Sequence, residues 1–372
     1  MSYQNEDFWI EVNLENVCAN YAEVKTKAGG NRGVMAVVKA DAYGHGLVAT
    51  GKALESHGCD FLAVSHFGEG RELREQGVTL PILLMTPALP ENYEAIVALD
   101  LIPAVDHQEN LALLSKAAGE REVKFHLKVN TGMNRFGIAP AAVSDFLRTL
   151  AAYENLKLGG VFSHLPCALI KDHPQTQEQI RLFDKVVAEM KAVLGDSFDV
   201  HLANSAAAIS YPEARYDYVR VGTLLYGQFP APFLNGTLDL KETWRAKARI
   251  LATRQIGKGD KVGYGADYTA KRPMSLGVIP VGYTDGFGIQ PPLNNVSLQR
   301  FAKQSGKLLR SFLWKRPNNV VYFEKKPLPV VGRIAMQTTV ISLDHTGLKT
   351  GDTVDVPLRR TAVAPSVKKI VL

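Results

Sequence analysis

The sequence predicts an α/β protein, with a (β/α)8 TIM-type barrel followed by a mainly β domain. Two observations carry this prediction. Before about residue 235, eight short apolar runs alternate with stretches of helical periodicity, and eight successive βαβ units are the number that closes such a barrel. Beyond that point, glycine- and proline-punctuated strands dominate. We therefore expect a barrel over residues 12–234 and a β-rich domain over 235–372.

The elements follow one another in a regular order. Residues 1–11 lead into an alternating strand that we expect to join the C-terminal domain, and a helical pattern follows over 14–27. The eight runs predicted as barrel strands are 34–38, 61–65, 81–85, 101–105, 123–129, 159–164, 198–203 and 218–222. The predicted helices between them include 48–57, 91–99, 107–118, 141–153 and 175–194. A doubly wound sheet is the alternative, but the Gly-x-Gly-x-x-Gly loop typical of that fold is missing.

The C-terminal domain shows short alternating segments. Strands are predicted at 248–253, 261–264, 275–281, 329–332 and 339–342. Residues 289–327 are irregular and rich in lysine and arginine. We interpret this stretch as an insertion that forms a solvent-exposed surface loop. The alternatives are a basic surface that contacts a partner and a lid over the substrate entrance.

Composition narrows the class of protein. The 372 residues are 46% hydrophobic and 22% charged, which is ordinary for a globular protein. No apolar run approaches the ~20 residues that span a bilayer, and residues 1–11 are polar and acidic with no signal-peptide pattern, so we expect a cytoplasmic protein without a membrane partner. The net charge of +6 is modest, and the sequence has no arginine-rich arm, RNA-binding aromatic motif or zinc finger. Its three cysteines are an odd number without metal-type spacing, so they predict neither a disulfide framework nor a metal site.

Lys39 stands at the end of the first predicted barrel strand, in front of Ala-Asp-Ala-Tyr-Gly-His-Gly. Barrel enzymes place their chemistry where strands end. Partial burial lowers the pKa of a lysine, which suits an amine that forms a Schiff base. Without further observations, an equally good interpretation is a structural lysine, whose aliphatic chain is buried and whose ammonium group reaches solvent at the barrel rim.

Several motifs together resemble one family. Lys-Ala-Asp-Ala-Tyr-Gly-His-Gly is similar to the pyridoxal phosphate (PLP) attachment segment of alanine racemases. Lys-x-Asn-Thr-Gly-Met-x-Arg-x-Gly at 128–137, His-Leu-Ala-Asn-Ser-Ala at 201–206 and Tyr-Val-Arg-Val-Gly-Thr at 218–223 match the same family in the same order. The resemblance covers most of residues 8–340.

The resemblance implies a role for each matched residue. Lys39 would hold PLP, and its phosphate would lie against Tyr43, Ser205 and the backbone amides of Gly222 and Thr223. His164 would join a hydrogen-bond chain behind the cofactor, although Ser163 replaces the usual threonine before it. The substrate would be bound by Arg135 and the backbone of Met336. Supporting residues would be Lys128, whose counterpart is carbamylated in many members, Asn204 and Tyr283.

Arg220 is the residue that points to racemisation. Facing the pyridine nitrogen of the cofactor, as the resemblance implies, an arginine leaves that nitrogen unprotonated and the cofactor a weaker electron sink, which favours returning a proton to the α-carbon over transamination. Racemisation needs a base on each face of the carbanion. The resemblance assigns these bases to Lys39 and to Tyr264 of a neighbouring subunit, so the functional unit would be a head-to-tail homodimer with shared active sites.

Two departures from the family pattern bear on the substrate. Gln337 stands where many members have aspartate, and the usual C-terminal tyrosine is absent from 356–372. The sequence therefore predicts a PLP-dependent racemase of a small amino acid. Alanine is the expected substrate, and D-alanine would go to cell-wall precursors; a serine or broader-specificity racemase is the alternative. A non-catalytic PLP-binding protein and a related decarboxylase are the alternatives of other classes.

Overall fold

The computed structural model describes residues 5–29, 32–289, 320–364 and 366–372. It divides into two compact units. One is formed by Asn13–Thr243, and the other combines Met1–Val12 with Trp244–Leu372. The second unit thus resumes at Trp244, later than the position near 235 where the sequence pattern changes.

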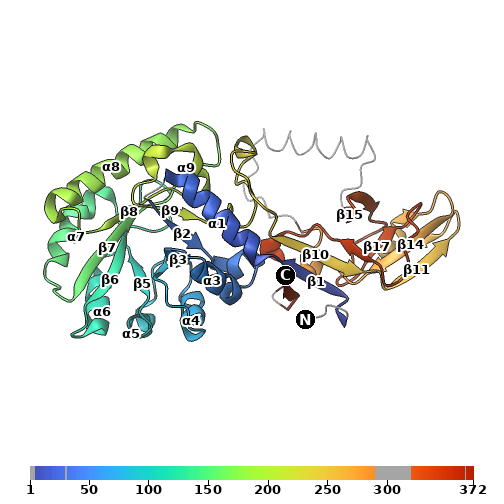
Figure 1. Cartoon of the computed structure of the whole chain (residues 1–372), viewed down its shortest axis with the longest axis horizontal. Helices are drawn as coiled ribbons and strands as arrows, with labels where there is room; N and C mark the ends of the chain where they lie inside the picture. The colour runs from blue at the N-terminus through green and yellow to red at the C-terminus, as the bar shows by residue number, and fades with distance from the viewer. Residues whose placement is uncertain (1–4, 30–31, 290–319, 365) are drawn as a thin grey trace. The chain divides into compact units, whose positions relative to one another are not determined.

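The larger unit is a closed barrel of eight parallel strands (Figure 1). The first of them, β2, pairs with the last, β9, and so closes the ring. The strands are β2 (Gly33–Val37), β3 (Phe61–Val64), β4 (Ile82–Leu84), β5 (Ile102–Val105), β6 (Val123–Lys128), β7 (Leu156–Phe162), β8 (Asp199–His201) and β9 (Tyr218–Val221). The predicted (β/α)8 barrel, followed by a β-rich domain, is confirmed.

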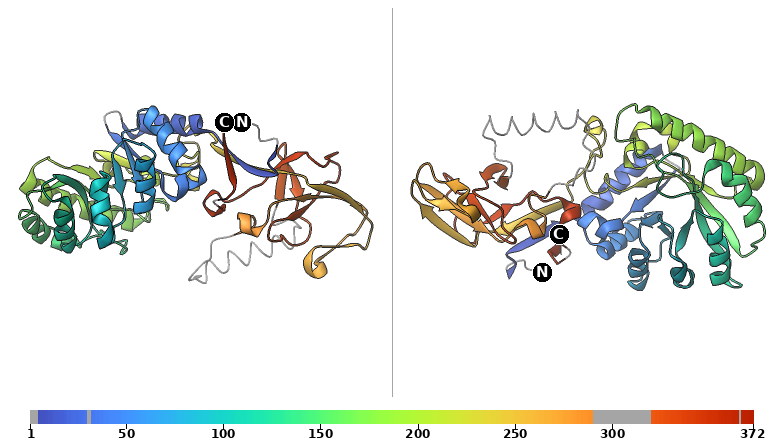
Figure 2. Two further views of the ribbon diagram at one scale, coloured as in Figure 1. Left: turned by 90° about the horizontal axis from the view of Figure 1, so that it is seen from below. Right: turned by 180° about the vertical axis from the view of Figure 1, so that it is seen from behind.

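Helices cover the outside of the barrel, as the ribbon views in Figure 2 show. The helix α7 buries one apolar stripe of Val143, Phe146, Leu147 and Leu150, the i, i+3, i+4, i+7 spacing of one helix face. Besides α7 (Val143–Leu150), the longer helices are α1 (Leu14–Gly29), α3 (Leu47–Ser56), α4 (Phe67–Glu75), α6 (Glu109–Ala118) and α8 (Pro174–Leu194). Shorter ones are α2 (Lys39–Gly44), α5 (Tyr93–Ala98) and α9 (Ser205–Ser210). Within the described residues, no helix is both long and apolar enough to cross a membrane.

The smaller unit is built from β-sheets. Its six-stranded sheet has the order β16-β15-β18-β10-β1-β19, and a three-stranded sheet has the order β11-β14-β17. The N-terminal strand β1 pairs antiparallel with β10 and parallel with β19. The strands are β1 (Phe8–Val12), β10 (Trp244–Arg249), β11 (Ala252–Ile256), β12 (Lys261–Val262), β13 (Tyr268–Thr269), β14 (Met274–Ile279), β15 (Val320–Phe323), β16 (Lys326–Pro329), β17 (Thr339–Ser342), β18 (Thr353–Asp355) and β19 (Lys368–Val371).

The prediction of a single strand over 248–253 is wrong. The backbone changes partners at this point, because Ile250 N–H donates to Asp352 O while Leu251 N–H donates to Val278 O. The chain therefore leaves one sheet and enters another within two residues, inside the uninterrupted apolar run of residues 250–252. Most of the predicted insertion at 289–327 lies outside the described residues, which resume at β15.

Candidate active site

The barrel strand β2 leads into a left-handed helical turn that starts at Lys39. Residues 40–43 have φ between 50° and 56°, although none of them is glycine. Ala42 N–H donates to Val38 O at 2.8 Å, an i to i−4 bond as in a helix. A left-handed helix of L-residues costs roughly 1–2 kcal/mol per residue. Strain of this kind persists where surrounding contacts enforce it, and it gathers at functional sites.

Glu69, at the start of α4, holds this turn. One carboxylate oxygen accepts from Ala40 N–H at 2.6 Å. The other accepts from Ser65 and His66 N–H, at 2.9 Å each, and so caps its own helix. The carboxylate thus connects the strained turn after Lys39 to the end of the neighbouring strand β3. Glu69 is not among the residues predicted from the sequence; its capping spacing from His66 is visible there, but its bond to Ala40 is not.

Tyr43 and Ser205 bring two hydroxyl groups to the backbone of Gly222. A Cβ atom on Gly222 would lie 2.4 Å from the Tyr43 hydroxyl oxygen, so only glycine fits there. Ser205 Oγ accepts the Gly222 N–H at 3.0 Å, which leaves the serine O–H free to donate elsewhere. Burial raises the pKa of Tyr43 to about 12, so its phenol keeps its proton. Asn204 fixes the serine by accepting the N–H groups of the following turn.

One cavity of about 230 Å³ unites the predicted cofactor residues at the strand ends of the barrel. The predicted residues that line it are Lys39, Tyr43, His164, Asn204, Ser205, Arg220, Gly222 and Thr223. Burial, and then the charge of Arg135, lowers the pKa of Lys39, while Glu69 acts in the opposite direction. A lysine amine in this environment loses its proton, and becomes nucleophilic, more readily than one in water.

Lys128 and Arg135 lie beside His164 in a smaller adjoining cavity. The Lys128 ammonium donates to Met85 O at 2.6 Å and lies 5.0 Å from the centre of the Phe162 ring. Burial, with Arg220 and Arg135 nearby, lowers the pKa of Lys128 to about 7. Burial and the same cations lower the pKa of His164 to about 3, so this imidazole is neutral. The concentration of positive charge suits an anionic ligand.

Arg220 is buried in the barrel interior and anchored by four hydrogen bonds. Its two terminal nitrogens donate to His201 Nδ1 at 2.8 Å, His201 O at 2.7 Å, Ser163 O at 2.5 Å and Leu202 O at 3.2 Å. Burial lowers the guanidinium pKa to about 9, which still leaves it charged at neutral pH. Within the described part of the chain, these bonds leave Nε–H as the donor available to a bound molecule. His201 is not among the site residues predicted from the sequence.

Tyr264, Tyr283 and Met336 gather in the smaller unit. Their exposed fractions are 73%, 47% and 58%, high values for such side chains. Tyr283 N–H donates to Ala335 O at 3.0 Å, next to Met336. An ion pair between Arg333 and Asp267 connects the same segment to the turn that carries Tyr264. The three residues therefore lie on adjoining loops of one unit. Across the described ranges, no group of three or more metal-binding side chains is found.

Comparisons with known proteins match both units. The model for the alanine racemase N-terminal domain covers residues 12–230, and the one for the alanine racemase C-terminal domain covers 243–370. The chain belongs to the alanine racemase family. An alanine racemase of Sorangium cellulosum is 33% identical to it over 95% of this chain and 90% of the relative. That of Halothermothrix orenii is 36% identical over 75% of this chain and 74% of the relative.

A solved structure shares the whole architecture. The alanine racemase of Clostridium difficile aligns with a TM-score of 0.85 at 26% identity, over 98% of this chain and 96% of the other. The similarity to alanine racemases therefore extends over both the barrel and the β-rich unit, and not over the barrel alone.

Proposed function

We propose that this protein is a PLP-dependent amino-acid racemase that interconverts L- and D-alanine. The observation that carries the proposal is the single barrel cavity that combines the Lys39 amine, the hydroxyls beside Gly222 and the anchored Arg220. When bound, PLP supplies an electron sink that makes the α-C–H bond of an attached amino acid acidic.

The residues of the cavity fit this cofactor. The Tyr43 and Ser205 hydroxyls can both donate to a phosphate. Gly222 has no side chain, which leaves room beside it for the Tyr43 phenol. Arg220 offers Nε–H to a ring nitrogen and keeps its own proton, so that nitrogen stays unprotonated. Lys39, whose pKa is lowered by burial, provides the amine that holds the cofactor.

Two bases would move the α-proton. Lys39 acts on one face of the α-carbon, and Tyr264 of the partner subunit acts on the other. The high exposure of Tyr264 in its own chain supports this role, since its hydroxyl is accessible to a second copy. Arg135 would bind the substrate carboxylate. Met336 lies in the same unit as Tyr264, so the partner subunit would supply it too; its carbonyl oxygen already accepts from Thr284, and its backbone N–H is the group that we assign to the substrate.

Exchange of the α-proton with solvent deuterium tests the reaction. The purified protein with PLP is incubated with L-alanine, L-serine and other small amino acids, and deuterium incorporation and chirality are measured. We expect exchange together with formation of D-alanine. The Tyr264→Phe variant should exchange one enantiomer without inverting it, because Lys39 remains. Cofactor binding without exchange of any amino acid would identify a PLP-binding protein on a racemase scaffold instead.

The shared active site has its own test. Lys39→Ala and Tyr264→Phe chains are each expected to be inactive as homodimers. When the two are co-expressed, a hybrid dimer holds one site with both bases intact, so random pairing should restore about one quarter of the wild-type activity. If both bases came from the same chain, the mixture would stay inactive.

The setting of the reaction is part of the proposal. We place the protein in the cytoplasm, with its D-alanine product available for cell-wall precursors. The match of the C-terminal family model to residues 243–370 supports an enzyme over a cofactor-storage barrel.

Gln337 is exposed, and its replacement by aspartate should show, through the ratio of alanine to serine turnover, whether this position affects substrate choice.

A further inference from the structure

Three polar side chains form a continuous hydrogen-bonded chain through the barrel interior. Arg220 on β9 bonds to His201 Nδ1 at 2.8 Å, and His201 Nε2 bonds to His126 Nδ1, also at 2.8 Å, on β6. Their exposed fractions are 4%, 0% and 2%. His126 does not line the active-site cavity, and the proposed reaction assigns it no role.

The hydrogen bonds between these three side chains can run in only one direction, from Arg220 to His201 to His126. A guanidinium can donate but cannot accept, so His201 Nδ1 must carry a lone pair. The proton of a neutral His201 is then on Nε2, and it is donated to His126 Nδ1. This makes His126 an acceptor at Nδ1 and places its own proton on Nε2. Burial and the charge of Arg220 lower the pKa of both imidazoles, which keeps them neutral.

A β-bulge creates the space for the His126 ring. Between β6 and β7, Phe125 pairs with Leu158 but His126 pairs with Gly160, so Gly159 has no partner in the register. Bulges next to active sites commonly change the direction of a side chain. A Cβ atom on Gly160 would lie 2.7 Å from His126 Cε1, closer than two carbon atoms approach. The local backbone is thus shaped around this imidazole.

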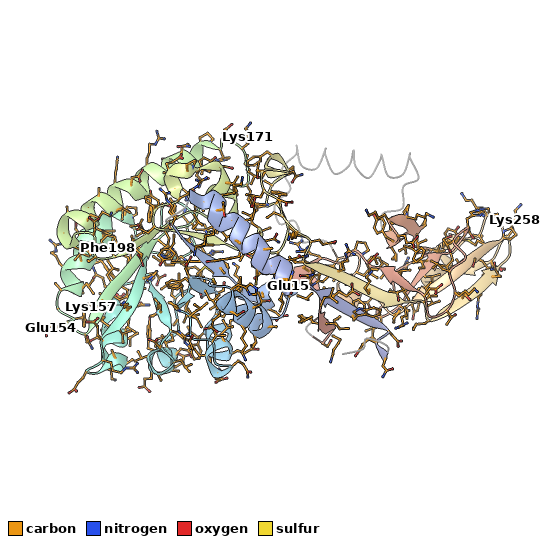
Figure 3. All side chains as sticks on the ribbon, in the orientation of Figure 1. Glu15, Glu154, Lys157, Lys171, Phe198 and Lys258 are labelled. Atoms are coloured by element: carbon orange, nitrogen blue, oxygen red, sulfur yellow. The ribbon has the colours of Figure 1, made fainter. Side chains whose placement is uncertain are left out.

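The far side of His126 borders the opposite end of the barrel. His126 lines a wide, open cavity there, together with Glu154, Lys157 and Phe198. Figure 3 labels these three residues near the starts of β7 and β8, and it labels Lys171, beyond the end of β7, at the other end of the barrel. Water in this cavity can accept the Nε2 proton of His126, so the chain can be satisfied along its whole length.

We infer that His126 is a positioning residue: by accepting the Nε2 proton of His201, it holds that imidazole with its Nδ1 lone pair on Arg220 and so fixes the guanidinium. Of the four bonds that anchor Arg220, the one to His201 Nδ1 goes to a side chain and the other three go to backbone carbonyls. A loosened His201 ring would therefore disturb the guanidinium at the cavity wall. The consequence for cofactor binding rests on the proposed function, whereas the hydrogen-bond chain itself does not.

Two substitutions of nearly equal size separate packing from hydrogen bonding. Asn in place of His126 retains an acceptor near the Nδ1 position, and Leu has the same shape without one. In ¹⁵N-histidine-labelled protein without cofactor, we expect His201 in wild type to be the neutral Nε2–H tautomer with a slowly exchanging ring proton. His201→Gln assigns its signals. His126→Asn should keep the protected proton, and His126→Leu should lose it.

PLP binding provides the second measurement. We expect His126→Leu to bind PLP about tenfold more weakly than wild type, the effect of losing one buried hydrogen bond, and His126→Asn to restore most of the affinity. Gly160→Ala keeps the histidine but displaces its ring, so it should reproduce the Leu variant even if that variant folds poorly.

Three outcomes would overturn the inference. They are a His201 protonated at Nδ1 in wild type, Leu and Asn variants with equal affinity for PLP, or a Gly160→Ala protein indistinguishable from wild type. A wild-type protein that binds no PLP would instead contradict the proposed function, and the NMR comparison of cofactor-free proteins would still decide the hydrogen-bond chain.

Discussion

The hydroxyl oxygen of Tyr43 lies 2.4 Å from the point that a Cβ atom on Gly222 would occupy. We predict that Gly222→Ala displaces this phenol and weakens PLP binding by at least the loss of one hydrogen bond to a charged group, roughly 1.5–3 kcal/mol. Tyr43→Phe, which removes the hydroxyl without a clash, is the matched control. Fluorescence titration with PLP measures both. Wild-type affinity in Gly222→Ala would show that the phenol has room to move aside.

The left-handed turn after Lys39 makes an unusual stability prediction. Ala40 is exposed at positive φ, so Ala40→Gly relieves roughly 1–2 kcal/mol of strain, against about 0.4–1 kcal/mol of added chain entropy in the unfolded state. We expect a net gain of up to about 1.6 kcal/mol. Ala112→Gly, exposed in the right-handed helix α6, should lose about 0.5–1 kcal/mol. Urea unfolding compares the two; equal signs would argue against a left-handed turn.

The Glu69 carboxylate should matter for both stability and cofactor binding. Glu69→Ala leaves three backbone N–H groups without their acceptor, at a cost of about 1–3 kcal/mol for each that stays buried and unpaired. It should also weaken PLP binding, because the turn that follows Lys39 is released. Glu72→Ala, on an exposed position of the same helix, is the control and should change neither quantity. A stability loss with unchanged PLP affinity would restrict Glu69 to capping its helix.

Lys128 should react with carbon dioxide. Its pKa of about 7 leaves a large neutral fraction of the amine near neutral pH, and a carbamate needs that neutral form. Since the neutral fraction grows as the pH rises through about 7, we expect a ¹³C-bicarbonate NMR signal of bound carbamate to grow in the same direction. Lys128→Met should abolish this signal, whereas Lys124→Met, on an exposed position of the same strand, should keep it. A signal that survives Lys128→Met would assign the carbamate to another amine.

The same shift in the pKa of Lys128 sets a trend in stability. Above pH about 7 the folded protein releases this proton, while the unfolded chain retains it up to the ordinary lysine pKa. The free energy of unfolding should therefore rise with pH in this window, and Lys128→Met should lack that rise. Parallel pH profiles for the two proteins would attribute the trend to other groups.

The sequence predicted the barrel well because its strands are buried on both sides. A run such as residues 34–38 is continuously apolar, as expected of a strand that is buried on both faces of its sheet. Polar residues such as Lys39 and Arg220 stand out against that background. The cofactor residues could be placed because they lie at strand ends, where the barrel topology brings them to one rim.

Other features depend on information that a linear pattern does not contain. The turn over residues 40–43 has no glycine to signal positive φ, since it is enforced by Glu69 from another element. The contact between His126 and His201 joins strands 75 positions apart and requires a bulge at Gly159. The sheet change at Ile250 is invisible for a related reason, because the apolar run of residues 250–252 passes through it without a glycine or proline.

The pairing of β1 with β10 and β19 has a consequence for biosynthesis. Trp9, Ile10 and Val12 are buried, and the strand that carries them pairs with strands that the ribosome makes after the entire barrel. At about 5–20 residues per second, this apolar segment waits on the order of ten to fifty seconds before its first partner emerges. During that time the barrel can fold, while the strand in front of it remains exposed to chaperones and to other nascent chains. A strand translated ahead of the barrel is thus among the last segments to reach its native neighbours.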